Sequence, residues 1–402
     1  MMPDVFELMS ALSKLDTGDI ATHAERCVAV RNRNAHCRRC SQACTSGAIS
    51  LIDNDLIIDV EKCVGCGACA TICPTAALEA RNPTDSELLR SSSQIMREKK
   101  VPPVFACKSL LESNSEAYDR SKVVEVGCLG RLEESELVTL IALGLLPLVL
   151  AHGACEACSQ LPGRRVADLV YETMTSLLGA WGHDNPLRLV EGLPAEVALE
   201  RREAVKTEDA AGMSRRDFFT QIKTGAQSVA TQSAAQVLRL DSQADEEKPP
   251  VVRVMRDGTL PHFIPNRRER MLDYLERIGE PSAEWLDSRL WGYLSINADL
   301  CNSCRMCATF CPTGAIVKFD DPGEDGVMGI EHYPADCVQC RLCEDVCPSD
   351  ALTISSRVPV RKLVEGEIVR HVMKPPEHEL NSPKQIYNAM YQLLGGGQIY
   401  ER

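Results

Sequence analysis

Twenty cysteines fall into three groups along the 402-residue chain, and their spacing is typical of metal-cluster ligands. The C-terminal group contains two runs of the form C-x2-C-x2-C-x3-C-P, "CNSCRMCATFCP" and "CVQCRLCEDVCP". In such a run three thiolates can hold one [4Fe–4S] cube, while the cysteine before proline reaches the neighbouring cube. The expected ligands of one cluster are Cys301, Cys304, Cys307 and Cys347, and those of the other are Cys337, Cys340, Cys343 and Cys311.

Zinc binding and simple packing are the alternatives for this group. Two interleaved runs contain more thiolates than the four ligands of a tetrahedral zinc site. Packing alone would not require the same spacing twice. Iron–sulfur clusters are therefore the preferred interpretation.

The N-terminal group repeats this pattern with one change. "CVGCGACATICP" keeps the full run, whereas its partner "CVAVRNRNAHCRRCSQACT" has C-x9-C-x2-C, and Thr45 replaces the usual proline. We expect two further clusters, one on Cys63, Cys66, Cys69 and Cys44 and one on Cys37, Cys40, Cys73 and Cys27. The alternative is that Cys27 does not ligate, which would leave a three-iron or labile cluster. His36 precedes Cys37 and is a candidate ligand, a solvated loop residue or a hydrogen-bond donor.

At these residues both groups resemble bacterial 2[4Fe–4S] ferredoxins. The resemblance implies two α+β ferredoxin-like dicluster domains, at residues 1–85 and 286–358, which would carry four [4Fe–4S] clusters and transfer electrons. It does not indicate a particular partner.

The middle group lies in a segment where apolar runs alternate with helical patterns. "VPPVFAC", "SKVVEVGC" and "LLPLVLAHGACEAC" read as strands, separated by a helical pattern over 133–145. Such alternation predicts an α/β domain with a parallel sheet, at residues 101–200. Ligands collect at the carboxyl edge of such sheets, where we expect Cys107, Cys128, Cys155 and Cys158. This gathering favours a four-thiolate metal site over a redox dithiol at C-x-x-C, a zinc site or free surface thiols.

The stretch "VVEVGCLGRLEESELVTLIALGLLPLVLAHGACEAC" resembles the delta-subunit domain of methyl-viologen-reducing hydrogenases, which is also fused to some heterodisulfide reductase subunits. By position Cys128, Cys155 and Cys158 match the motif cysteines of that family, and Cys107 takes the place of an upstream cysteine pair. The resemblance implies one additional cluster, a [2Fe–2S], and electron transfer between partner enzymes. His152 and Ala154 flank Gly153 here, where the family has glycine directly before cysteine.

The remaining segments give weaker signals. Residues 201–285 read as a helical and linker region, and "MSRRDFFTQ" within them resembles a twin-arginine export motif at an unusual internal position. "NRRERMLDYLERIG" (266–279) is amphipathic, and we expect it to pack on the second dicluster domain. The tail, 359–402, contains a helix predicted from a serine cap, a proline and a terminal glycine run.

Composition limits the class of protein. A net charge of −13 disfavours a nucleic-acid partner, and no secretory signal or membrane-spanning run is apparent. No Walker loop or G-x-G-x-x-G after a strand suggests a nucleotide site. We expect a cytoplasmic protein in a reducing environment, whose cysteines mostly bind metal.

These observations predict a multi-cluster electron-transfer protein rather than an independent catalyst. Its expected partners are soluble carriers or redox enzyme subunits, such as a hydrogenase, a formate dehydrogenase or a heterodisulfide-reductase-like system. The alternative is a dithiol or sulfur-reducing enzyme acting at Cys155 and Cys158, supplied by the ferredoxin domains. An iron–sulfur redox sensor is a third hypothesis, and the lack of a DNA-binding feature counts against it.

Overall fold

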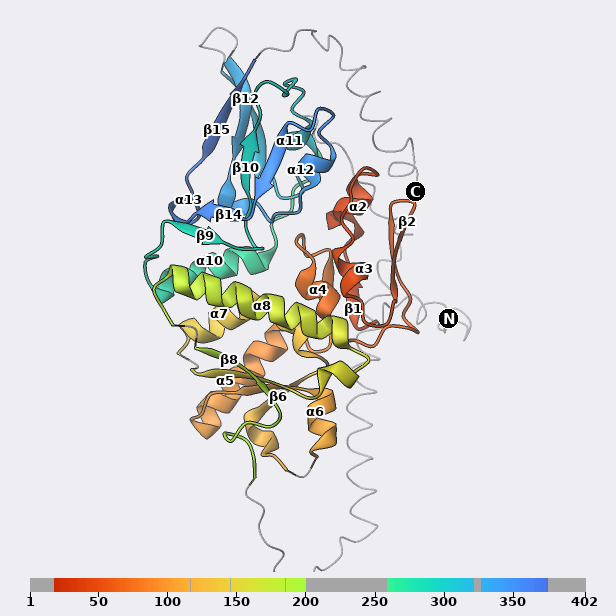
Figure 1. Ribbon diagram of the computed structural model, residues 1–402, viewed down its shortest axis with the longest axis vertical. Helices are drawn as coiled ribbons and strands as arrows, with labels where there is room; N and C mark the ends of the chain where they lie inside the picture. Colours follow the sequence, from red (N-terminus) through yellow and green to blue (C-terminus); the bar gives the residue numbers. More distant parts are fainter. Residues whose placement is uncertain are drawn as a thin grey trace, which may run out of the picture. The chain divides into compact units, whose positions relative to one another are not determined.

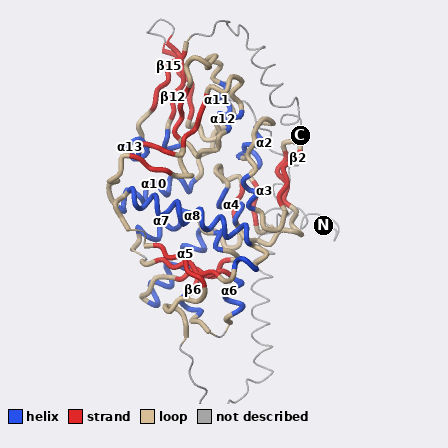
Figure 2. Tube along the Cα trace, in the orientation of Figure 1, coloured by secondary structure: helices blue, strands red, loops and turns tan. Residues whose placement is uncertain are grey.

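The computed structural model describes residues 18–115, 117–144, 146–184, 186–199, 259–321 and 327–374 (Figures 1 and 2). All of them belong to one compact unit, formed by Met1–Leu199 and Val252–Glu401. We divide this unit into an N-terminal part (18–82), a middle part (83–199) and a C-terminal part (259–374). The internal "MSRRDFFTQ" segment, the 241–250 linker and the expected tail helix lie outside the described residues.

The middle part is built on a four-stranded sheet in the order β6-β5-β7-β8. Its strands are β5 (Val104–Cys107), β6 (Val123–Val126), β7 (Leu148–His152) and β8 (Leu187–Glu191). All three neighbouring pairs are parallel, which confirms the parallel sheet expected from the sequence. Strands β5 and β7 are buried at every residue, as continuous apolar runs in a parallel sheet should be.

Helices cover this sheet. They are α5 (Asp85–Lys99), α6 (Lys108–Ser113), α7 (Glu134–Ala142) and α8 (Leu161–Ala180), with short 3-10 turns η2 (Arg120–Lys122), η3 (Leu129–Arg131) and η4 (Cys155–Ala157). The pattern over 133–145 predicted a longer helix than α7, which ends before Gly144, a residue with φ of +76°. Helix α8 buries Val170, Met174 and Leu177, spaced so that they share one face.

The N-terminal part has two antiparallel strand pairs and several short helices. β1 (Ile20–Thr22) pairs with β4 (Leu78–Ala80), and β2 (Ile49–Ile52) pairs with β3 (Asp55–Ile58). The helices are η1 (Ala24–Arg26), α2 (Val28–Arg31), α3 (Arg39–Ala43) and α4 (Ala68–Ile72).

The C-terminal part repeats this plan and extends it. β10 (Tyr293–Ile296) pairs with β13 (Leu352–Ser355), and β11 (Ile316–Asp321) pairs with β12 (Val327–His332). The helices are α11 (Met306–Phe310), η5 (Pro334–Asp336), α12 (Leu342–Asp345) and α13 (Val360–Val364). In addition, β9 (Trp285–Asp287) pairs with β14 (Arg357–Pro359), and β15 (Val369–Met373) adds a third strand beside β12.

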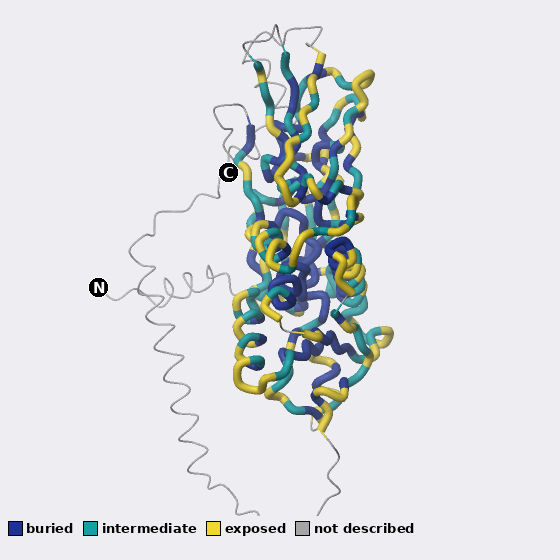
Figure 3. Tube along the Cα trace, turned by 90° about the vertical axis from the view of Figure 1, so that its left-hand side faces the viewer, coloured by how far each residue is buried: buried dark blue, intermediate teal, exposed yellow. Residues whose placement is uncertain are grey.

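Helix α10 (Asn266–Ile278) connects the C-terminal part to the middle part. We expected this helix to pack on the second dicluster domain, but its main neighbour is α7. Its buried residues Met271 and Leu275 join the same hydrophobic core as Leu137 and Leu140 of α7. In Figure 3 the buried stretches of the trace, drawn dark blue, lie mostly inside the molecule, and the exposed stretches lie at its outer turns. Among the helices that the structure describes, none combines the length and apolarity needed to cross a membrane.

This packing predicts a large cost for truncating α8 on its buried face. Leu177→Ala should lower the free energy of unfolding by about 2–5 kcal/mol, because a buried leucine leaves a cavity when it is shortened. Leu169 lies on the same helix and is 42% exposed, so Leu169→Ala should change the free energy of unfolding by less than about 0.5 kcal/mol. Urea denaturation of the two anaerobically purified variants checks this difference. Equal losses for both would contradict the assignment of the buried face.

Candidate iron–sulfur cluster sites

Three small cavities are each lined by four cysteines. In the N-terminal part, Cys44, Cys63, Cys66 and Cys69 surround about 310 Å³ of empty space, and Cys27, Cys37, Cys40 and Cys73 surround about 340 Å³. In the C-terminal part, Cys311, Cys337, Cys340 and Cys343 surround about 310 Å³. These are the groupings that the spacing predicts, and the similar volumes indicate that one kind of group fits all three.

The fourth predicted set also lies together. Burial raises the pKa of the Cys304 thiol, and the nearby thiols of Cys347 and Cys301 raise it further. Burial likewise raises the pKa of Cys307, with Cys304 and Cys301 among the contributing neighbours. The structure thus brings all four of these cysteines into one neighbourhood.

Cys27 reaches its set from the start of α2. The longer loop of the C-x9-C spacing contains α2, and Cys27 is the residue that precedes this helix. Burial raises the pKa of its thiol to about 11, with the thiols of Cys73 and Cys37 contributing. Cys27 therefore lies beside the other members despite its distance in sequence.

We call Cys44, Cys73, Cys311 and Cys347 the remote cysteines, because each ends one run of cysteines and is grouped with the thiols of the other run. The four share one local environment. A hydroxyl two residues later lies 3.7–3.8 Å from each sulfur, in the pairs Cys44 and Ser46, Cys73 and Thr75, Cys311 and Thr313, and Cys347 and Ser349. In three of them a backbone N–H four residues later donates to the sulfur at 3.2–3.3 Å, from Ala48, Ala77 and Ala351. The sequence signal is C-x-[ST]-x-A, which the cysteine spacing alone does not reveal. Hydrogen bonds to sulfur are one way in which a protein sets cluster potential.

Some thiols of these sets are poorly suited to ionise without a metal, whereas at Cys44 burial is outweighed by hydrogen bonds that lower the pKa. Burial raises the pKa of Cys40 and of Cys337 to about 12, and neighbouring thiols oppose ionisation further. Iron overcomes this, because a coordinating thiol loses its proton to the metal charge. Within the described ranges, no three His, Cys, Asp or Glu side chains converge on one ion position. A cube does not need such convergence, since each thiolate binds a different iron.

The four cysteines of the middle part lie at the predicted sheet edge. Cys107 ends β5, Cys128 follows β6, and Cys155 and Cys158 follow β7. Burial raises the pKa of Cys128 to about 12, and the thiols of Cys66, Cys107 and Cys155 contribute. Cys128 is therefore close to its own group and also to Cys66 of the N-terminal part.

The surroundings of Cys155 are cationic, unlike those of the remote cysteines. Its sulfur lies 3.5 Å from Nδ1 of His152, and Arg164 contacts the other ring nitrogen. Arg164 also donates to Asp168 at 2.7 Å, which fixes the guanidinium. Burial raises the pKa of the Cys155 thiol, while Arg164 opposes this change. Cys158 accepts a hydrogen bond from the backbone of Gln160 at 3.4 Å.

Glycines allow the middle part to approach the N-terminal part closely. A Cβ on Gly67 of the N-terminal part would lie 2.4 Å from Cδ of Arg131 in η3, and within the middle part a Cβ on Gly163 of α8 would lie 2.7 Å from Sγ of Cys128. Helices α3 and α4 pack on the same end of α8 (Figure 1). The hydroxyl of Thr45, the residue in place of proline, donates to Cys66 Sγ at 3.6 Å.

The N-terminal and C-terminal parts also meet beside cysteines. Val28 and Ala35 form one hydrophobic cluster with Phe310, Leu342 and Val346, and Cys37 and Cys340 pack against it. At its rim, the backbone N–H and Nδ1 of His36 both contact the carboxylate of Asp345 at 2.9 Å. Arg39 donates to the carbonyl of Gln339 at 2.9 Å. His36 thus pairs with a carboxylate across this contact.

Comparison with known proteins supports part of this picture. Residues 300–351 match the family described as "4Fe-4S dicluster domain", and residues 56–79 match "4Fe-4S binding domain". A 45-residue segment is 47% identical to a subunit of the ion-translocating oxidoreductase complex of Methanosarcina acetivorans. That segment is 11% of this chain and spans only 17% of the relative.

Neither family match includes residues 101–200, so the resemblance of the middle part to the hydrogenase delta subunit stays a prediction. The ferredoxin-type expectation for the two flanking parts is confirmed. The chain contains 4Fe–4S ferredoxin-type domains and has an iron–sulfur electron-transfer role.

Proposed function

We propose that this protein is an electron relay with five clusters in a single row. The observation that supports this order is the pair of contacts between cysteine sets, Cys128 beside Cys66 and Cys37 with Cys340 in one hydrophobic cluster. Each contact joins a set in one part of the molecule to a set in the next part. Electrons would move by one-electron hops between neighbouring clusters.

Each step of the row rests on its own neighbours. The middle set adjoins the Cys44/63/66/69 set through Cys66. That set adjoins the Cys27/37/40/73 set, because the thiol of Cys40 contributes to the raised pKa of Cys69, whose larger causes are burial and Cys66. The Cys27/37/40/73 set adjoins the Cys311/337/340/343 set. The thiol of Cys307 then contributes to the raised pKa of Cys343, whose main cause is burial. The two ends of the row are the middle set and the Cys301/304/307/347 set.

We further propose four [4Fe–4S] clusters on the dicluster sets and one [2Fe–2S] cluster on Cys107, Cys128, Cys155 and Cys158. None of the twenty cysteines forms a disulfide, which suits a reducing compartment such as the cytoplasm. The partners would be redox enzyme subunits or soluble carriers at the ends of the row. The named relative is a subunit of an oxidoreductase complex, which supports partners of this class.

A second candidate function is dithiol chemistry at Cys155 and Cys158. It is favoured by Arg164, because a nearby cation favours the thiolate form of Cys155. The five-cluster relay and the dithiol enzyme predict opposite outcomes for these two cysteines.

The first test is iron content with low-temperature EPR after anaerobic purification. Four cubes and one [2Fe–2S] cluster give about 18 iron per chain, and Cys155→Ala/Cys158→Ala should reduce this to about 16 with loss of one signal. Both thiols should also resist alkylation in the native holoprotein. Glu156→Ala, an exposed residue of the same turn, is the control and should keep all iron. Unchanged iron in the double variant, with rapid alkylation in the native protein, would replace the relay by the dithiol enzyme.

A second prediction concerns the close contact between α8 and Cys128 within the middle part. Gly163→Ala should shift Cys128 and alter the spectrum of the middle cluster, because the new Cβ would come within 2.7 Å of its sulfur. Gly179→Ala on the same helix meets nothing within 4 Å and should stabilise the protein by about 0.5–1 kcal/mol. EPR of both variants gives the comparison. An unperturbed signal in Gly163→Ala would argue against a cluster on Cys128.

A third prediction separates the two interpretations of Cys27. If Cys27 is a ligand, Cys27→Ala should lose about one iron when a three-iron cluster forms, or about four when the cluster is lost. The same preparation should keep the EPR features of the C-terminal part. Full iron content in this variant would mean that Cys27 does not ligate.

A further inference from the structure

A cavity whose lining includes no cysteine lies between the N-terminal part, the start of α5, η3 and the start of α10. Its volume is about 530 Å³, which falls within the range of small-molecule sites. Its walls come from four separate stretches of the chain, within 21–26, 70–86, 131–133 and 263–270. A site assembled in this way has no linear motif, so the absence of a nucleotide motif from the sequence does not bear on it.

Cationic side chains dominate this cavity although the chain is acidic. The arginines that line it are Arg26, Arg81, Arg131, Arg267 and Arg270, and the carboxylates are Glu79, Asp85 and Glu133. Five guanidinium groups and three carboxylates line the cavity, and two further carboxylates just outside it pair with lining arginines, Glu25 with Arg26 at 3.5 Å and Glu136 with Arg131 at 3.7 Å. The whole chain, by contrast, has a net charge of −13.

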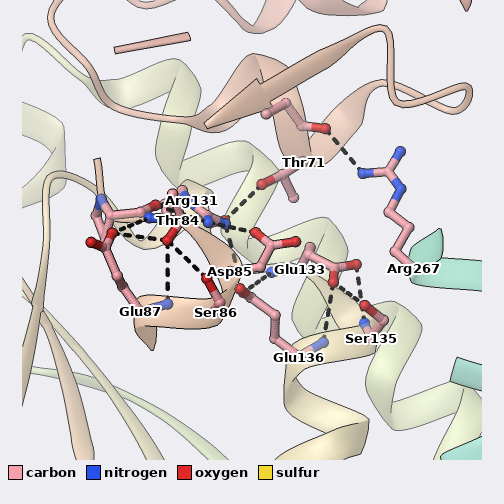
Figure 4. A network of polar contacts seen from close by, with 12 residues as sticks. Thr71, Thr84, Asp85, Ser86, Glu87, Arg131, Glu133, Ser135, Glu136 and Arg267 are labelled. Carbon is pink, nitrogen blue, oxygen red and sulfur yellow. Dashed lines mark hydrogen bonds and ion pairs between the residues drawn. The ribbon is translucent and has the colours of Figure 1, made fainter. Parts of the chain in front are cut away.

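Two of the arginines share one carboxylate. Arg131 donates to Asp85 at 2.6 Å (Figure 4). Arg270 lies 3.4 Å from the other oxygen of Asp85 and 3.2 Å from Glu133. Burial favours the neutral form of Asp85, but Arg131 and Arg270 outweigh it and hold its pKa below the ordinary value. The carboxylates of this wall are therefore already engaged.

Arg267 is the cation without an acidic partner. Its Nη1 donates to the carbonyl oxygen of Ala70 at 3.1 Å, a neutral acceptor (Figure 4). Its buried Nε has no hydrogen-bond partner, and no carboxylate of the described ranges forms an ion pair with it. A buried guanidinium donor without an acceptor is costly, and a bound anion would remove that cost.

The backbone beside Arg267 favours the same charge. Arg267 lies in the first turn of α10, a 13-residue helix that follows Pro265 and has no side-chain cap. Unpaired N–H groups and the helix dipole favour an anion there. The lining also contains the apolar side chains of Ala21, Ala76 and Leu78, which form its apolar wall, and the ring of Phe263 lies 3.6 Å from the guanidinium of Arg26.

We propose that this cavity binds a nucleotide, with its phosphates on Arg267, Arg270 and the start of α10 and its ring system against Phe263 and the apolar wall. Ala70 and Thr71 lie between Cys69 and Cys73, and Ala76 follows Cys73, so the cavity borders the cysteine sets of the N-terminal part. The nucleotide could be a regulator or a redox cofactor, and both present the same phosphate chemistry. Binding itself does not depend on the proposed relay.

Calorimetric titration of the anaerobic full-length holoprotein tests the proposal, with pyrophosphate, ADP, FMN and NADH as probes. At least one nucleotide should bind with 1:1 stoichiometry and more tightly than pyrophosphate. Arg267→Gln should weaken that binding about tenfold or more, and Arg267→Lys should weaken it less because the charge remains. Arg277→Gln is the matched control, since Arg277 is an exposed residue in the last turn of α10. It should bind as the wild type does.

Iron content and urea midpoint, measured on every variant, establish that each is folded and loaded. Bleaching of the cluster absorbance by NADH, or by FMN after its reduction, would identify a redox nucleotide, and binding of ADP without bleaching would identify a regulator. Absence of saturable binding by all nucleotides, or equal affinities in Arg267→Gln and Arg277→Gln, would overturn the site. Binding of pyrophosphate as tight as that of every nucleotide would overturn the nucleotide assignment. None of these results alters the iron count on which the relay is judged.

Discussion

The close approach of the Cys66 loop to the Cys128 turn is the constraint on which the arrangement of the three parts depends. Side chains normally keep two backbones apart, and here glycine removes them on both sides. A Cβ on Gly67 of the Cys66 loop would lie 2.4 Å from Cδ of Arg131, and one on Gly127 would lie 3.4 Å from the carbonyl oxygen of Gly65. A parallel sheet presents its cysteines at one edge, but only this absence of side chains lets that edge reach a neighbouring ferredoxin-type part.

Buried charge also joins α7 to the C-terminal part and to η3. Glu134 is almost fully buried and pairs with Arg289 at 2.7 Å, and Glu136 lies 3.7 Å from the buried Arg131. Burial raises the pKa of Glu136 well above its ordinary value, and Arg131 opposes this only in part. Such pairs contribute little net stability because desolvation offsets their attraction, yet removing one partner typically costs about 3–5 kcal/mol. They make one relative placement of α7, η3 and the C-terminal part far more favourable than its alternatives.

Local patterns in the sequence predicted the features that depend on local chemistry. Thiolate spacing placed the cysteines in sets, and alternating apolar runs predicted a parallel sheet whose carboxyl edge gathers Cys107, Cys128 and the last pair. The third strand beside β12 and the packing of α10 on α7 were not predictable in this way, because each is decided by which apolar face is available far along the chain. The pairing of His36 with Asp345 likewise joins residues more than 300 positions apart.

The middle site and the dicluster sets differ in the contacts around their cysteines. The remote cysteines of the four dicluster sets receive neutral hydroxyl and amide contacts, whereas Cys155 lies beside His152 with Arg164 behind it. Positive charge near a cluster stabilises its reduced form, and neutral hydrogen bonds do so more weakly. Arg164 would therefore favour the reduced form of a cluster at the middle site. Arg39 has the same sign of effect on Cys37 and Cys340, where the N-terminal and C-terminal parts meet, so the proposed row would have stabilising positive charge both at one end and in its interior.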